Sequence, residues 1–134
     1  MDRATFEAAA DAGRFLEWAE VVPGQLSGTP RPEPLPDRDL LLEINVDGAT
    51  QVKALHPDAL MVLVVAPSED DQRARMRQRG DTPEQIARRV ALGAQEEQTG
   101  RRLADHVVVN DDLDRAVGEV LGILAGHRSP PEGA

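Results

Sequence analysis

The chain has 134 residues, the usual length of one domain, and a formal net charge of −9. That charge disfavours a nucleic-acid polymer or an anionic membrane surface as a partner. The absence of cysteine excludes disulfides, thiol catalysis and cysteine-ligated metals. The first residues lack the apolar run of a signal peptide, and no run of eighteen apolar residues could span a membrane, so we expect a cytoplasmic protein.

The first forty residues predict a helix, a strand and a linker. Residues 3–12 place apolar side chains on one helix face, and Gly13 can end that helix. Residues 15–22 predict a strand, and the following Pro-Gly pair predicts a turn. Four prolines between residues 30 and 39 make a helix there nearly impossible and predict an extended linker.

Three apolar runs predict buried strands, at residues 40–46, 59–66 and 106–109. Continuous apolar strands that alternate with helices are typical of a parallel sheet covered on both faces. We therefore expect an α/β fold.

Capping residues predict where the remaining helices begin. Ser68 can cap a helix that runs to Arg79. Thr82, followed by Pro83 and three residues later by Gln85, forms a capping box that starts a helix running to about residue 100. Together they predict a helix–turn–helix hairpin.

The last predicted helix begins after Asn110, which we expect to be its N-cap. Its apolar side chains recur at helical spacing up to Leu124, and Gly126 is expected to end it. Composition predicts that residues 127–134 form a disordered tail. The three histidines are spread along the chain without metal-like spacing, so no metal ligand is predicted.

Arginine is concentrated in the predicted hairpin. Eight of the fifteen basic residues lie between residues 73 and 102, and with four acids there this stretch has a charge of +4. They are Arg73, Arg75, Arg77, Arg79, Arg88, Arg89, Arg101 and Arg102. Two interpretations stay open: a lid that closes guanidinium groups over phosphates, or a solvated charged face. The single lysine, Lys53, follows Val52, so the chain lacks the Gly-Lys pair of a phosphate-binding loop.

Several short motifs occur in the order found in one enzyme family. They occupy residues 15–21, 28–29, 42–49, 67–68, 75–80 and 107–114. With these motifs the chain resembles guanylate kinase, over nearly its whole length up to about Leu124. The resemblance implies an incomplete P-loop-kinase-like parallel sheet flanked by helices, with part of the GMP-binding subdomain and a helical lid. It divides residues 1–126 into a remnant of that subdomain (1–39), a core (40–67 and 103–126) and the lid (68–102).

The resemblance also implies a reaction and its residues. Guanylate kinases move the γ-phosphoryl group of ATP to GMP with Mg²⁺, mainly by positioning and charge neutralisation. The positions implied on the GMP side are Glu17, Thr29, Glu43 and Asn45, of which Glu17 reads guanine. The implied phosphate-contacting lid positions are Arg75, Arg79 and Arg89, and the adenine-side position is Asn110.

The chain departs from the family pattern in ways that bear on activity. The first strand, the P-loop and the first helix of the family have no counterpart in it, so we expect neither tight ATP or Mg²⁺ binding nor turnover by this chain alone. Ser27 replaces a tyrosine, and Asn45 replaces an acid. Either the missing half is encoded upstream in frame, with Met1 at the place of a valine, or the chain is a non-catalytic binding or interaction module. A plain structural domain is a third possibility. An exposed sheet edge would favour self-association.

Overall fold

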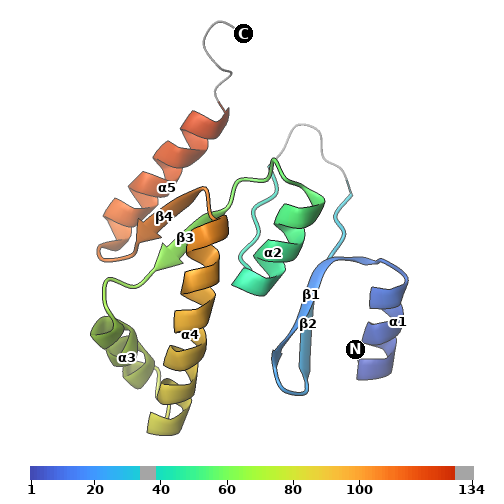
Figure 1. The fold of residues 1–134 in the computed structure, drawn as a ribbon, viewed down its shortest axis with the longest axis horizontal. Helices are drawn as coiled ribbons and strands as arrows, with labels where there is room; N and C mark the ends of the chain where they lie inside the picture. The colour runs from blue at the N-terminus through green and yellow to red at the C-terminus, as the bar shows by residue number, and fades with distance from the viewer. Residues whose placement is uncertain (34–38, 129–134) are drawn as a thin grey trace, which may run out of the picture. The chain divides into compact units, whose positions relative to one another are not determined.

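The computed structural model describes residues 1–33 and 39–128 (Figure 1). The chain forms two compact units, Met1–Ala59 and Leu60–Ala134. Part of the predicted linker, residues 34–38, and the end of the predicted tail, residues 129–134, lie outside the described residues.

The first unit opens with a helix and a hairpin. Helix α1 spans Arg3–Asp11, and strand β1, Phe15–Val22, confirms the strand expected there. A second strand, β2 (Gln25–Pro30), was not predicted and pairs antiparallel with β1. The turn between them contains Gly24 with φ of 86°, a backbone conformation that favours glycine. Its N–H donates to the Glu20 carboxylate at 2.6 Å, which helps to fix the hairpin register.

Aromatic rings fix α1 against β1. Phe6 stacks on Phe15 with ring centroids 4.5 Å apart and meets Trp18 edge-on at 6.0 Å. Across the hairpin, a Cβ added to Gly28 would lie 2.8 Å from the Cβ of Trp18 and 2.9 Å from the Glu17 carbonyl oxygen. The close approach of the two strands therefore requires glycine at position 28.

The strand predicted at residues 40–46 is absent, which corrects the sequence expectation. Residues 39–45 belong to no helix or strand, and Leu40 and Leu41 are 57% and 84% exposed. An apolar run becomes a strand only when a neighbour accepts its backbone hydrogen bonds, and no described strand pairs with it. Instead, Asn45 caps an unpredicted helix, α2, that spans Val46–Leu55.

Helix α2 is attached to β1 through one side-chain amide. Gln51 Nε2 donates to the Trp18 carbonyl oxygen at 2.6 Å, and Gln51 Oε1 accepts from the Trp18 N–H at 3.1 Å. The amide thus makes the pair of hydrogen bonds that a neighbouring strand would make at this point of the β1 edge.

The second unit contains a parallel two-stranded sheet flanked by helices, which confirms the expected α/β class. Strand β3 (Val62–Val65) pairs with β4 (His106–Val109) in the register Val62 to His106. β3 is shorter than the predicted run at residues 59–66, whereas β4 matches its prediction. The side chain of Val108 is completely buried, and Met61 and Ile86 are among the other buried apolar residues.

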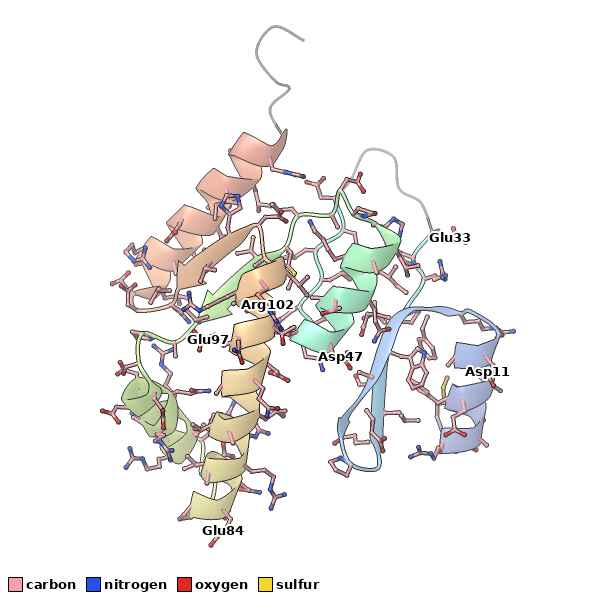
Figure 2. All side chains as sticks on the ribbon, in the orientation of Figure 1. Asp11, Glu33, Asp47, Glu84, Glu97 and Arg102 are labelled. Carbon is pink, nitrogen blue, oxygen red and sulfur yellow. The ribbon has the colours of Figure 1, made fainter. Side chains whose placement is uncertain are left out.

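The predicted helical hairpin is present as α3 (Glu69–Gln78) and α4 (Pro83–Leu103). Ser68 caps α3, and the capping box at Thr82 is complete, because Thr82 and Gln85 each bond the other's backbone N–H. Figure 2 shows Glu84 at the start of α4, with Glu97 and Arg102 nearer its other end. An acid in the first turn and arginine in the last suit the helix dipole.

Two predictions for the last helix are wrong. Helix α5 spans Leu113–Arg128, and Asp112 Oδ1, not Asn110, accepts the N–H of Arg115 at its start. Aspartate caps as well as asparagine, so the loop geometry decides which is used. The helix also continues through Gly126. Among the described residues, no helix is long and apolar enough to cross a membrane.

Candidate functional site

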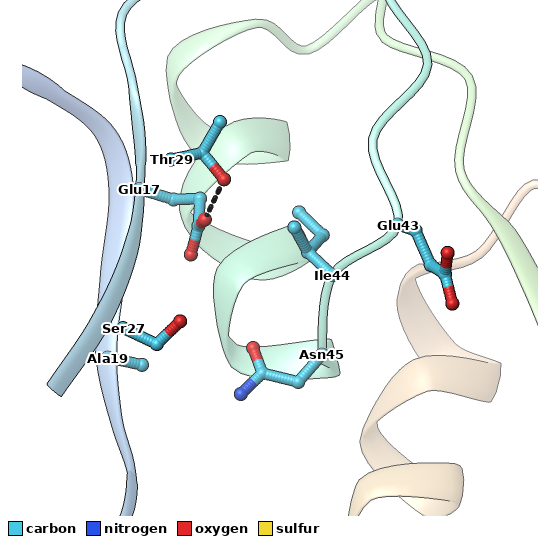
Figure 3. A pocket seen from close by; sticks show the side chains of 7 residues that line it. All are labelled: Glu17, Ala19, Ser27, Thr29, Glu43, Ile44 and Asn45. Carbon is cyan, nitrogen blue, oxygen red and sulfur yellow. Dashed lines mark hydrogen bonds between the residues drawn. The ribbon is translucent and has the colours of Figure 1, made fainter. Parts of the chain in front are cut away.

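A pocket of about 260 Å³ opens in the first unit between the hairpin and the start of α2 (Figure 3). It is lined by Glu17, Ala19, Ser27, Thr29, Glu43, Ile44 and Asn45. The strand register explains part of this set, because Glu17 pairs with Thr29 and Ala19 with Ser27. All four predicted GMP-side residues therefore meet at one pocket.

Glu17 is the buried charge of this pocket. Only 5% of the residue is exposed, and its Oε1 accepts the Thr29 hydroxyl at 2.5 Å. A buried carboxylate is costly unless it is hydrogen-bonded, and a short hydroxyl–carboxylate bond is among the stronger compensations. The second oxygen, Oε2, lies near the first turn of α2, where a Cβ on Gly48 would approach it to 2.5 Å. The positive end of the helix dipole favours a carboxylate there.

Asn45 has a structural task as well as a place in the pocket. Its Oδ1 accepts the N–H of Gly48 at 2.8 Å and so caps α2. The amide nitrogen of Asn45 is then the group that this side chain can offer to a ligand as a donor. Glu43 is exposed, and Figure 3 shows its carboxyl group pointing away from that of Glu17.

The predicted lid residues lie in the second unit. Arg75 on α3 donates from Nη2 to the Asn110 carbonyl oxygen at 2.8 Å, so a predicted lid residue contacts the predicted adenine-side residue. Arg79 pairs with Asp81 at 3.1 Å. Arg89 is exposed on α4. The described contacts thus place Arg75 and Asn110 side by side.

Other arginines make local ion pairs. Arg73 contacts Glu69 at 2.9 Å and Arg101 contacts Glu97 at 2.8 Å, each four residues apart on one helix. Such exposed pairs contribute little to stability. They agree with the charged-face interpretation for these two arginines.

The described donor set does not fit a resident metal ion. Within residues 1–33 and 39–128, no three His, Asp or Glu side chains lie close enough to hold one. Near the pocket, Glu43 points away from Glu17, and asparagine occupies position 45. Mg²⁺ is usually held by carboxylates together with substrate phosphates. We therefore assign no catalytic step to a metal ion bound by these residues.

Two residues that shape the site were not predicted. Gly48 lies against Glu17, and Gln51 attaches α2 to β1. Asn45 with Asp47 in the following turn is a helix-start signal that could have revealed α2 and hence the position of Gly48. Nothing local marks Gln51, because its partner lies 33 residues away.

Comparison with known proteins identifies the family. The sequence model of the guanylate kinase family matches residues 1–126. A guanylate kinase of Thermus thermophilus is 44% identical over 134 residues, covering 96% of this chain and 60% of the relative. Guanylate kinase of Chromobacterium violaceum is 41% identical, covering 96% and 62%.

A solved structure agrees at the level of the fold. The crystal structure of guanylate kinase from Anaplasma phagocytophilum superimposes with a TM-score of 0.72 at 24% identity, covering 97% of this chain and 64% of that one. The chain spans about 60% of the length of the curated relatives it matches first. From the family match and these relatives together, the chain belongs to the guanylate kinase family.

Proposed function

We propose that this chain carries the guanine-reading pocket and the lid of a guanylate kinase, whose family reaction is ATP + GMP to ADP + GDP. The observation that supports this most directly is the buried Glu17 carboxylate in a pocket whose other polar groups include hydroxyls and an amide. The family resemblance implies that this residue reads guanine.

The pocket chemistry favours guanine over adenine. Guanine presents two kinds of N–H donor, N1–H and the 2-amino group, beside the acceptor O6. An ionised carboxylate only accepts, so Glu17 Oε2 suits those donors, and the Asn45 amide nitrogen suits O6. Adenine has neither N1–H nor the 2-amino group, and it carries an amino donor in place of the acceptor O6, so it cannot make the same set of hydrogen bonds to Glu17 and Asn45, which costs binding free energy.

The lid arginines supply the second part of the proposal. Arg75, Arg79 and Arg89 offer planar guanidinium groups that match phosphate oxygens. In phosphoryl transfer such groups neutralise charge as it shifts between oxygens. Arg75 uses one of its five N–H donors on the Asn110 carbonyl oxygen, and its other donors could meet a phosphate. Asn110 is proposed for the adenine side.

We further propose that the 134-residue polypeptide alone does not turn over. Its sequence has no glycine-rich loop with a lysine, the device that cradles the β- and γ-phosphates with backbone N–H groups. Arginines cannot by themselves preorganise the transferred phosphoryl group. ATP and Mg²⁺ are therefore ligands of the family reaction that these residues would not hold tightly.

A non-catalytic binding module is the second candidate. The observation that favours it is Asn45, which serves as a helix cap where the family has an acid. In that case the pocket would bind a guanine nucleotide without any phosphoryl transfer, even when the rest of a kinase fold is supplied.

The test is a titration of the ¹⁵N-labelled 134-residue chain with GMP and AMP, followed by NMR. We expect weak binding of GMP, with a dissociation constant of about 1 mM, or about 4 kcal/mol, and weaker binding of AMP. Glu17→Gln should abolish the preference, whereas Glu84→Gln, at an exposed position on α4, should retain it. Equal binding of both nucleotides, or no shifts at all, would contradict the proposed guanine pocket. ADP formation from ATP and GMP in a coupled assay would contradict the proposed lack of turnover.

A further inference from the structure

We propose that Arg115 is a positioning residue of the nucleotide site: it holds residues 109–112, which end β4 and lead to α5, so that the side-chain amide of Asn110 keeps the orientation that meets an adenine ring. This role rests on the adenine-side function proposed for Asn110, and it adds the residue that fixes that side chain. Three hydrogen bonds of one guanidinium, all within the second unit, carry the inference.

The Arg115 guanidinium joins the end of β4, the following loop and helix α5. Nη2 donates to the carbonyl oxygen of Val109, the last residue of β4. Nε donates to Asp111 Oδ1 at 2.7 Å, and Nη1 donates to Glu119 Oε2 at 2.7 Å. Because a guanidinium is planar and its donors are fixed relative to one another, these bonds restrain strand, loop and helix together.

This arrangement differs from an ordinary ion pair on a helix. Arg101 directs both Nε and Nη2 to the single carboxylate of Glu97, four residues earlier on α4. Such a pair stabilises its helix slightly, and the bond from Arg115 to Glu119 does the same for α5. The bond to the Val109 carbonyl adds nothing to a helix, because that carbonyl belongs to the preceding strand. Its consequence is a fixed path of the backbone between β4 and α5.

The backbone of Asn110 itself is also held. Its N–H donates to the Val65 carbonyl oxygen at 2.8 Å, and its carbonyl oxygen accepts Arg75 Nη2 at 2.8 Å. Since backbone groups alternate along a strand, the Val109 carbonyl lies on the edge of β4 that faces away from β3, where Arg115 bonds it. Both backbone polar groups of Asn110 are therefore occupied, and its side-chain amide is the group that it can offer to a ligand.

An amide can bind adenine through two hydrogen bonds only when its plane is set correctly. A carboxamide offers one acceptor beside one donor, and adenine offers its 6-amino donor beside a ring-nitrogen acceptor. Both bonds form only when the two planes nearly coincide, so a rotation of the backbone that carries Asn110 would lose one of them. The side chain of Arg115 is 45% exposed, so we expect its ion pairs to contribute more to this orientation than to folding stability.

The test is a titration of the ¹⁵N-labelled 134-residue chain with adenosine, followed by NMR at the side-chain NH₂ group of Asn110 and the backbone amide of Asp112. Adenosine is neutral, so the loss of a positive charge does not by itself weaken its binding. We expect binding in the millimolar range for the parent, and binding about fivefold weaker for Arg115→Gln, equivalent to about one net hydrogen bond. Glu119→Ala is the matched control: it removes one partner of Arg115, leaves the bonds to Val109 and Asp111, and should bind adenosine like the parent.

A double-mutant cycle shows whether Arg115 acts through Asn110. Asn110→Ala should weaken adenosine binding, and adding Arg115→Gln to it should weaken binding no further, an outcome that a merely stabilising role would not produce. Circular dichroism checks that each variant is folded. Asp111→Ala, which removes the Nε partner, should also weaken adenosine binding and keeps the test decisive if Arg115→Gln does not fold.

Equal adenosine affinity in the parent and Arg115→Gln chains would overturn the positioning role, and so would a further loss in the Asn110→Ala background. If adenosine leaves the Asn110 signals of the parent unchanged, the adenine-side function of Asn110 fails, and the role of Arg115 fails with it. The guanine pocket is tested separately by the titration with GMP, because Glu17 lies in the other unit.

Discussion

The carboxylate of Glu17 lies so close to the backbone of Gly48 that a Cβ added there would be 2.5 Å from Oε2 and 3.0 Å from the carboxyl carbon. The first residue belongs to β1 and the second to the first turn of α2. The hairpin and the helix therefore share one close contact, and a side chain at position 48 would have to displace the Glu17 carboxylate. The position of the pocket's buried acceptor depends on that contact, and a substitution at position 48 can test it.

Gly48→Ala should lower both stability and guanine-nucleotide binding. Alanine is favoured over glycine inside a helix by about 1 kcal/mol, but relieving the overlap would displace a buried, hydrogen-bonded carboxylate, which costs about 1–3 kcal/mol. We expect a net loss in the free energy of unfolding by urea denaturation. Gly118→Ala on α5, where nothing lies within 4 Å of the added Cβ, should instead gain about 0.5–1 kcal/mol.

A double-mutant cycle isolates the contact itself. If the loss in Gly48→Ala comes from Glu17, then Glu17→Ala should make the same alanine neutral or favourable, because the opposing group is gone. A loss of equal size in both backgrounds would show that the carboxylate is not the cause.

Asn45→Ala should destabilise the first unit by about 1 kcal/mol, because it removes the cap at the N-terminus of α2. Asn45→Asp should leave stability within about 0.5 kcal/mol, since aspartate caps equally well. Asn45→Asp should nevertheless weaken binding of the guanine nucleotide, because aspartate replaces the amide donor by a second carboxylate beside Glu17. Equal urea midpoints for the parent and Asn45→Ala chains would refute the cap's contribution.

The residues that could be predicted from the sequence are those whose partners lie nearby. Ser68 and Thr82 were identified correctly because a cap bonds an N–H three residues away. Choosing between Asn110 and Asp112 needed the loop geometry, since both side chains can cap. Four pocket residues were predicted only through the family resemblance, because Glu17 and Thr29 become neighbours through the hairpin register.

The apolar run at residues 40–46 is an element that could not be predicted from the sequence. Composition predicts that such a run is a strand, but a strand is completed by another segment's hydrogen bonds, and composition does not say whether that segment is present. Gln51 was missed for a related reason, because a glutamine on a helix gives no local sign of a partner on a distant strand.

Gln51→Ala should cost about 1–3 kcal/mol of stability. It removes both hydrogen bonds to the backbone of Trp18 and leaves the strand edge unpaired at that residue. Gln98→Ala, at an exposed position on α4, should change stability by less than about 0.5 kcal/mol. Hydrogen exchange gives a second readout, since the Trp18 amide should lose protection in Gln51→Ala alone. An unchanged Trp18 exchange rate would contradict the attachment described for α2.

The protonation of Asp111 should make the stability of the chain depend on pH. The Arg115 guanidinium, bonded to the carboxylate at 2.7 Å, and then the N–H of Asp112 lower the pKa of Asp111 below its usual range. A group whose pKa is lowered on folding stabilises the protein above its unfolded pKa, and that contribution is lost as pH falls through the folded pKa. In Asp111→Asn, the free energy of unfolding should therefore decrease less between about pH 5 and pH 2 than in the parent chain, measured by urea unfolding at a series of pH values. Arg115→Gln should reduce this decrease in the same way, because it removes the main cause of the lowered pKa of Asp111. If the parent and Asp111→Asn chains lose stability in parallel over that range, the ion pair does not couple folding to protonation.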